Sequence, residues 1–263
     1  MCGIFGIVAK GGSNVVRELN TLFVLSESRG KEAAGIAIFD GREITVFKEP
    51  RTASQMIRTA TYRALLDESI ARNSGQSIAA IGHSRLVTNG RGVISANNQP
   101  VIRDNAVCVH NGIIVNDAKI WIDHPDLSRH AEVDTEALLA LFGKFRRAGC
   151  EVSAAIARVF REIEGTASIA ILIPDEPRLL LATNNGSLYF TQSDQSGRLH
   201  FASERYILQR LIDATSPSGD PPPIHAVLNG QGVLIDIATR AVRAFDFAEE
   251  RQPSHGLAAR RAR

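Results

Sequence analysis

The second residue of the chain, Cys2, is the side chain best suited to covalent chemistry. Initiator methionine is usually trimmed before a small side chain, which would make Cys2 the first residue with a free α-amine. An α-amine titrates at about 7.7 to 8.0, so near neutral pH a good fraction can accept the thiol proton. One residue then supplies nucleophile and base. Taken alone, a cysteine that starts an apolar strand is better explained as a small buried hydrophobe.

A second cluster of polar residues follows a predicted strand, in the run GHSRLVTNG that begins at Gly82. The planar guanidinium of Arg85 can bind a carboxylate through two hydrogen bonds, and the Thr88 hydroxyl can add a third. A surface salt bridge for Arg85 and a turn-capping role for Thr88 are the structural alternatives.

A third cluster is formed by Asn111 and Gly112, which follow the strand pattern AVCVH at residues 106–110. A side-chain amide and a glycine N–H at a strand end are neutral donors of the kind that form an oxyanion hole. The structural alternative is that Asn-Gly forms a turn. For the neighbouring His110 we favour the role of a core histidine whose hydrogen bonds are satisfied.

The fourth candidate, Asp134, stands at the start of a predicted helix, where its structural function would be to cap the helix or to interact with its dipole. A carboxylate at that position can also bind an ammonium group. Arg85 and Asp134 together would bind the two charged ends of an α-amino acid, as glutamine recognition requires. Spacing along the chain does not establish that they converge.

The elements that must position these residues are strands grouped in hairpins, with helices between the groups. Asp40-Gly41 is a strong hairpin signal between the first two strands after the first helix. This order favours an α+β fold with antiparallel sheets. The segment 214–224 contains three successive prolines and is predicted to be a loop. Strands are predicted at 34–39, 43–48, 77–82, 106–110, 167–173, 178–183, 187–191, 198–202, 231–236 and 241–246, and helices at 15–28, 53–71, 134–147, 152–164 and 204–213.

Seven runs, in order along the chain, together resemble the class II glutamine amidotransferases, a family of N-terminal-nucleophile enzymes. The resemblance covers roughly the whole chain except its tail, and chance agreement of several ordered motifs is very improbable. The runs are CGIFGIV from Cys2, RGKEAAGIA from Arg29, GHSRLVTNG from Gly82, NNQP from Asn97, VHNGIIVN from Val109, EVDTE from Glu132 and ASE from Ala202.

The resemblance implies a four-layer αββα sandwich with two antiparallel sheets, the Ntn-hydrolase fold. It implies that Cys2 is the nucleophile, that Asn111 and Gly112 form the oxyanion hole, and that no metal or cofactor takes part. The substrate would be glutamine. Its α-carboxylate would be bound by Arg85 and Thr88 and its α-amine by Asp134, with Arg29 ordering the surroundings of the nucleophile.

The domain predicted from the resemblance spans residues 1–248, followed by a basic tail at 249–263. Family enzymes usually carry an acceptor domain, and nothing here resembles one, so we expect a separate synthetase or acceptor subunit as partner. Two other functions stay open: a γ-glutamyl amidohydrolase acting on a larger metabolite, and a catalytically idle glutamine-sensing subunit. A homo-oligomer is also left open by the sequence.

The composition favours a globular protein outside the membrane, with 44% hydrophobic and 22% charged residues. No apolar run reaches the length of a transmembrane helix, about 18 residues. A net charge of +2 gives no basis for nucleic acid as the main partner, and the least favoured role is nucleic-acid binding through the tail. The short N-terminal apolar run lacks a basic start, and the three cysteines are too scattered for a disulfide framework. We therefore expect a cytoplasmic protein.

Overall fold

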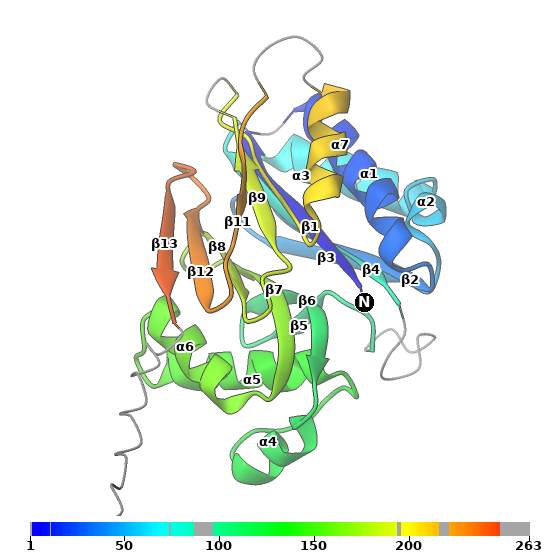
Figure 1. The fold of residues 1–263 in the computed structure, drawn as a ribbon. Coiled ribbons are helices and arrows are strands. Elements are labelled where there is room, and N and C mark those ends of the chain that lie inside the picture. Colours follow the sequence, from blue (N-terminus) through cyan, green and yellow to red (C-terminus); the bar gives the residue numbers. More distant parts are fainter. Residues whose placement is uncertain are drawn as a thin grey trace, which may run out of the picture.

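The structure is a computed structural model that describes residues 2–10, 12–73, 75–86, 97–193, 196–215 and 221–247. Two antiparallel sheets form its centre (Figure 1). The predicted residue Thr88 and the predicted tail 249–263 lie outside the described residues.

The first sheet carries the start of the chain and has seven strands, in the order β11-β9-β10-β1-β4-β2-β3. Every pairing in it is antiparallel. Its strands are β1 (Gly3–Lys10), β2 (Ala33–Phe39), β3 (Ile44–Glu49), β4 (Ser77–Arg85), β9 (Tyr189–Gln192), β10 (Leu199–Ala202) and β11 (Ile224–Ala226).

The second sheet has six strands, in the order β13-β12-β8-β7-β6-β5, and is also antiparallel throughout. It is built mostly from consecutive hairpins, as the short polar turns predict. Its strands are β5 (Val101–Arg103), β6 (Ala106–Ile114), β7 (Gly165–Ile173), β8 (Arg178–Thr183), β12 (Gln231–Asp236) and β13 (Val242–Asp246).

Helices cover the outer face of each sheet (Figure 1). The first sheet is covered by α1 (Ser13–Ser26), α2 (Ala53–Met56), α3 (Ala60–Arg72) and α7 (Arg205–Thr215), with the short helix η1 (Glu27–Arg29) after α1. The second sheet is covered by α5 (Asp134–Arg147) and α6 (Val152–Glu162), with α4 (Asp117–Asp123) beside them. No helix in these described ranges is long and apolar enough to cross a membrane.

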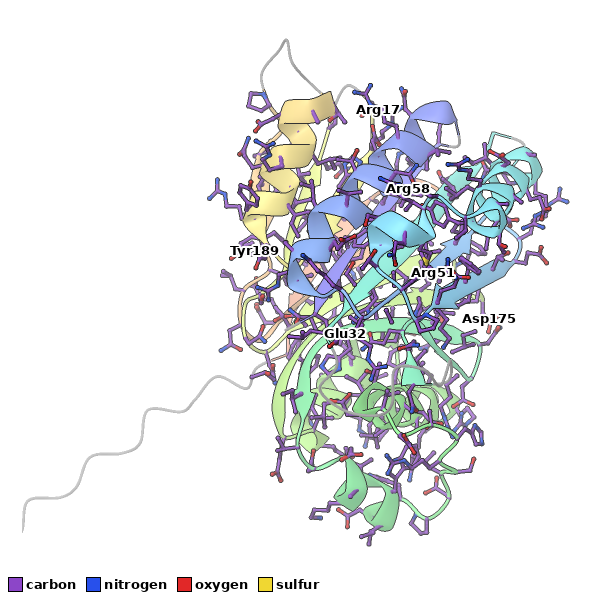
Figure 2. The ribbon with its side chains drawn as sticks, turned by 90° about the vertical axis from the view of Figure 1, so that its right-hand side faces the viewer. Arg17, Glu32, Arg51, Arg58, Asp175 and Tyr189 are labelled. Atoms are coloured by element: carbon purple, nitrogen blue, oxygen red, sulfur yellow. The ribbon has the colours of Figure 1, made fainter. Side chains whose placement is uncertain are left out.

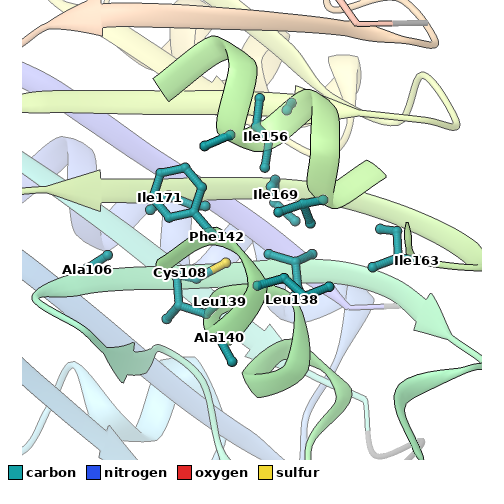
Figure 3. Packing of buried hydrophobic residues seen from close by; sticks show 14 of the residues in the cluster. Ala106, Cys108, Leu138, Leu139, Ala140, Phe142, Ile156, Ile163, Ile169 and Ile171 are labelled. Carbon is teal, nitrogen blue, oxygen red and sulfur yellow. The ribbon is translucent and has the colours of Figure 1, made fainter. Parts of the chain in front are cut away.

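The alternation of side chains along each strand creates three apolar layers. In β4, Ile78 and Ala80 pack against the helices, whereas Ala79 and Ile81 pack against the second sheet. Figure 3 shows the corresponding packing on the other side, where Cys108 of β6 lies beneath α5. Both faces of each sheet are therefore buried, which confirms the predicted αββα sandwich.

Several element boundaries differ from the prediction. The predicted helix 53–71 is two helices, because Thr59 caps the start of α3 and interrupts the first segment. The strands β4 and β6 extend beyond residues 82 and 110, where polar side chains mask the strand pattern. The loop predicted at 214–224 overlaps the end of α7 and the start of β11. Three short elements, β5, α4 and β11, were not predicted.

Candidate active site

Cys2 immediately precedes β1, at the end of the first sheet where β1 approaches β6 (Figure 1). In β1, Ile4 and Val8 point into the layer between the two sheets. The same alternation places the Cys2 side chain at the open end of that layer. The residue is 8% exposed, and its Sγ lies 3.5 Å from the Leu86 carbonyl oxygen.

Arg85 is the last residue of β4, whereas the sequence predicts that its run follows the strand. It is buried, and its Nη1 donates a hydrogen bond of 2.5 Å to Oδ1 of Asn98. The neighbouring segment approaches closely: the Glu32 N–H donates to the Arg85 carbonyl at 3.1 Å. A Cβ on Gly30 would lie 2.2 Å from the Arg85 carbonyl carbon, so only glycine permits this approach. Figure 2 shows Glu32 near the C-terminal end of α1.

Asn111 and Gly112 lie within β6, opposite Ser168 and Ala167 of β7. The alternative that Asn-Gly forms a turn is therefore wrong, because the antiparallel ladder continues to Ile114. Asn111 is fully buried, and neither its Oδ1 nor its Nδ2 has a hydrogen-bond partner among the described residues. Since a buried amide without partners is costly, this group is available for a ligand.

Asp134 is the first residue of α5, with Val133 at the cap position that we expected Asp134 or Thr135 to occupy. Its Oδ2 accepts from the Ile114 N–H and its Oδ1 from the Thr135 N–H, both at 2.8 Å. Burial raises the pKa of this carboxyl, but the His110 ring and the two backbone donors outweigh burial and lower the pKa below its usual value. Asp134 is therefore a buried carboxylate that is ionised at neutral pH.

The structure brings Cys2, Arg85 and Asp134 into one electrostatic environment. Burial raises the pKa of the Cys2 thiol and Asp134 raises it slightly further, whereas the hydrogen bond with the Leu86 backbone and the charge of Arg85 lower it. Burial lowers the pKa of Arg85, while Cys2 and Asp134 act in the opposite direction. Interactions of this kind weaken with distance, so the three groups are neighbours. The net effect on Cys2 is a raised pKa, which keeps the thiol protonated at neutral pH and creates a need for a base.

Gln99 links β6, the strand that contains Asn111 and Gly112, to α5, a role that was not predicted from the sequence. Its Nε2 donates to the His110 carbonyl at 3.1 Å and to Thr135 Oγ1 at 3.2 Å, and its Oε1 accepts from the His110 N–H at 2.5 Å. The side chain thus extends the pairing of β5 with β6 to His110, two residues beyond the last backbone pair, Val101 with Cys108. The NNQP run was the only signal, and a motif does not reveal which partner each amide binds.

Asn98, in the same run, connects Arg85 to the rest of the first sheet. The Asn98 side chain accepts a hydrogen bond from Arg85. The Asn98 backbone carbonyl accepts another from Lys48 Nζ at 2.7 Å. Lys48 also donates to the Pro100 carbonyl at 3.0 Å, and burial lowers the pKa of Lys48 to about 8. A lysine on β3 therefore fixes the segment that orients the guanidinium.

His110 is a buried histidine, as we favoured from the sequence. Its Nδ1 lies 3.2 Å from Thr135 Oγ1 and 3.7 Å from Asp134 Oδ1, and its Nε2 lies 3.4 Å from the Thr166 carbonyl. His110 is therefore a satisfied core residue that also supports the Asp134 carboxylate.

Arg29 lies in η1 and forms an ion pair with Glu204, which follows directly after Ser203 in the ASE run. Ser203 holds β1 in place, since its N–H donates to the Ile4 carbonyl at 2.8 Å and its Oγ accepts from the Ile4 N–H at 3.3 Å. Arg29 thus joins the segment that secures the start of β1, next to Cys2.

Comparisons with known proteins agree with this geometry. A family model described as "Glutamine amidotransferase domain" matches residues 83–210. The chain is 29% identical over 189 residues to glutamine--fructose-6-phosphate aminotransferase [isomerizing] of Shouchella clausii, and 30% identical over 189 residues to the protein of the same name in Rhizobium leguminosarum. Each alignment covers 71% of this chain and 29% of the relative, so the chain spans less than a third of those proteins.

Solved structures of low sequence identity share the fold. Glutamine phosphoribosylpyrophosphate amidotransferase from B. subtilis superposes with a TM-score of 0.70 at 21% identity, over 94% of this chain and 49% of that one. A glutamine aminotransferase class-II domain protein from Silicibacter pomeroyi gives a TM-score of 0.54 at 16% identity, over 93% of this chain and 98% of that one. The chain therefore carries a glutamine amidotransferase domain and belongs to the class II, N-terminal-nucleophile glutamine amidotransferases.

Proposed function

We propose that this chain hydrolyses the side-chain amide of glutamine, with Cys2 as nucleophile. The observation that supports this most directly is the meeting of Cys2, Arg85 and Asp134 near a buried Asn111 carboxamide that has no partner within the described residues. A guanidinium and a carboxylate match the two charges of an amino-acid head group. A thiol and a free amide match the needs of acyl transfer at its other end.

In the proposed reaction, Cys2 Sγ attacks the side-chain carbonyl carbon of glutamine. The α-amine of Cys2 accepts the thiol proton. The Asn111 amide and the Gly112 N–H stabilise the oxyanion of the tetrahedral intermediate. The carbon–nitrogen bond then breaks, and the proton passes from the amine to the leaving nitrogen as ammonia forms. Water hydrolyses the remaining γ-glutamyl thioester to glutamate and frees the thiol.

Arg85 and Thr88 bind the α-carboxylate of glutamine in this proposal, and Asp134 binds its α-amine. Arg29 acts indirectly, by holding the segment beside the nucleophile. Asp134 suits its part because it is ionised at neutral pH and rigidly held by two backbone N–H groups.

The test is glutamate production by the purified protein, compared with Cys2→Ala, together with intact-mass measurement of Met1 removal. Cys150→Ala is the matched control, because that half-buried cysteine lies in the turn between α5 and α6. We expect Cys2→Ala to abolish turnover and Cys150→Ala to preserve it. Turnover that survives in Cys2→Ala, or in protein that fully retains Met1, would contradict the mechanism.

Two other results would indicate the alternative functions. Glutamine binding without turnover would indicate a sensing subunit. Cleavage of a larger γ-glutamyl compound in preference to glutamine would indicate a specialised amidohydrolase. Both outcomes use the same purified protein and the same Cys2→Ala control.

We further propose that the ammonia serves a separate acceptor enzyme. The relatives named glutamine--fructose-6-phosphate aminotransferase align with this chain over only 29% of their length, so most of each relative has no aligned counterpart. The isolated chain should release one ammonia for each glutamate, with or without fructose 6-phosphate. If the ratio of ammonia to glutamate falls when fructose 6-phosphate is added, the chain itself transfers the nitrogen.

A further inference from the structure

The proposed mechanism makes no use of the buried imidazole of His83. It lies on β4, and it shares with Ala79 and Ile81 the strand face that packs against the second sheet. It is 1% exposed, and neither Nδ1 nor Nε2 has a well-aligned hydrogen-bond partner among the described residues. A buried imidazole without well-aligned partners is costly, so its position suggests a ligand or a neighbouring group that completes its hydrogen bonding.

The imidazole is held in its neutral form. Burial lowers the pKa of His83 to about 3, and the neighbouring charges of Arg85 and His110 lower it in the same direction. A hydrogen-bond interaction between the ring and the His110 backbone raises the pKa, and its effect is smaller than that of burial and of the two neighbouring charges. A neutral ring carries one N–H donor at every pH at which the protein is used. It is therefore suited to donate a permanent hydrogen bond and not to exchange protons.

The strand β6, which carries the proposed oxyanion hole, is one of two strands of the second sheet that approach β4, the other being β7. Cα atoms of β4 come within 8 Å of those of β6, closer than the spacing of about 10 Å between packed sheets. The His83 ring is close enough to the His110 backbone for that group to affect its pKa. Asn111 is the next residue, and alternation with Val107 and Val109 points its side chain toward the first sheet.

The neutral imidazole and the Asn111 carboxamide thus point from facing sides of the two sheets toward the layer between them, and neither has a well-aligned hydrogen-bond partner among the described residues. We propose that His83 is a positioning residue of the oxyanion hole, whose ring N–H donates to Asn111 Oδ1 and so directs Nδ2 toward the reacting carbonyl. Without such a donor the carboxamide can rotate, and its oxygen would then repel the developing oxyanion. This inference rests on the proposed glutamine hydrolysis for its kinetic consequence but not for its geometry.

The kinetic test replaces His83 by Phe, which keeps a planar ring and removes the N–H, and by Asn, which restores a donor. We expect His83→Phe to lower kcat by about 5- to 30-fold, the effect of a hydrogen bond of one to two kcal/mol, with little change in KM. His83→Asn should recover part of the loss. The pH profile should keep its shape, because the ring stays neutral throughout.

The matched control is Ser84→Ala, on the opposite face of the same strand and also buried without a partner within the described chain. It should leave kcat unchanged. The double variant His83→Phe/Asn111→Ala should be no slower than Asn111→Ala alone, because the histidine acts through that amide. Additive losses, a changed KM with constant kcat, or a shifted pH profile would each overturn the positioning role.

A crystal structure of the wild-type protein gives a readout that does not depend on turnover. The inference requires a His83 ring nitrogen within about 3.2 Å of Asn111 Oδ1, and a rotated carboxamide in His83→Phe. Another group bound to Oδ1 would overturn the inference even if glutamine is hydrolysed. Conversely, an intact His83–Asn111 contact in a protein that does not hydrolyse glutamine would refute the proposed function and leave this pairing established.

Discussion

At the scale of single residues, the site joins a protonated thiol to a carboxylate that stays ionised. Burial raises the pKa of Cys2, whereas the bonds to Asp134 outweigh burial and lower the pKa of its carboxyl. The two shifts have different consequences for activity. Asp134 keeps its charge throughout the neutral range, while the thiol depends on a nearby base before it can react.

We therefore predict that kcat/KM for glutamine rises with pH through an apparent pKa of about 7.7 to 8.0, that of the Cys2 α-amine. Deprotonation of this amine creates the base, so activity is lost as the pH falls below that value. Asp134 contributes no limb there, because its pKa lies below the usual 3.8. Steady-state kinetics from pH 5 to 9 provides the measurement. A profile that stays flat over this range would contradict the role of the amine.

Gly112 can accept no side chain. A Cβ at this position would lie 1.9 Å from the Thr166 carbonyl oxygen, so Gly112→Ala must displace β6 from β7 and with it the proposed oxyanion donor. We expect kcat to fall by about two to three orders of magnitude. Gly149→Ala is the control, because a Cβ there meets nothing within 4 Å and only its positive φ adds strain. Equal kcat values for the two variants would refute the prediction.

At the scale of elements, the Gln99 side chain takes the place of a strand residue beside β6 and connects β6 to α5 by hydrogen bonds. Gln99→Leu removes three hydrogen bonds and leaves the His110 N–H and carbonyl without them in the interior. We predict a loss of about 3 kcal/mol in the free energy of unfolding, together with a lower kcat, since Asn111 is the next residue. Urea unfolding measures the first effect.

The control for Gln99→Leu is Gln192→Leu on β9, which removes a single bond to the Arg240 carbonyl. It should cost about 1 kcal/mol and leave kcat unchanged. If both variants lose the same stability and neither loses activity, the hydrogen bonds of Gln99 contribute no more than those of Gln192 and do not support the site.

The sequence predicted the elements best where apolar periodicity continues to the end of a segment. Helix α5 begins and ends at the predicted residues 134 and 147, and β8 and β12 also match their predicted bounds. The strands β4 and β6 were predicted too short, because His83 and Asn111 are polar residues on a buried face. The functional residues themselves interrupt the pattern from which strands are recognised.

The site was predicted in part for a related reason. Motifs indicated Cys2, Arg85, Asn111 and Asp134, and the structure places the first, second and fourth in one electrostatic environment. The hydrogen bonds of Gln99 and the unpaired ring of His83 depend on how two sheets face each other. No spacing along the chain encodes that contact.

At the scale of the whole molecule, buried carboxylates make the fold sensitive to acid. Asp40 is 2% exposed; burial raises its pKa, but hydrogen bonds from the backbone and from Arg72 outweigh burial and lower it. The pKa of Asp134 is also lowered. A carboxyl group with a lower pKa in the folded state stabilises the fold above its unfolded pKa, and this contribution disappears as the pH falls through the folded value.

We predict that the free energy of unfolding declines as the pH falls below about 3.8, the ordinary pKa of these groups. Asp40→Asn should be less stable at neutral pH and should show a smaller decline. Urea titrations between pH 3 and 7 test both statements. An unchanged slope in Asp40→Asn would assign the acid sensitivity to other groups.

The division of the site between two sheets has a consequence for how the protein loses activity during denaturation. The thiol is attached to one sheet and the proposed oxyanion donors to the other, so in the proposed mechanism neither half of the sandwich is active alone. Swelling of the layer between the sheets would separate the reacting groups before any helix or strand melts. Under mild denaturant, glutamate release should therefore cease while the far-ultraviolet circular dichroism is still native, so that turnover reports how tightly the two halves are joined.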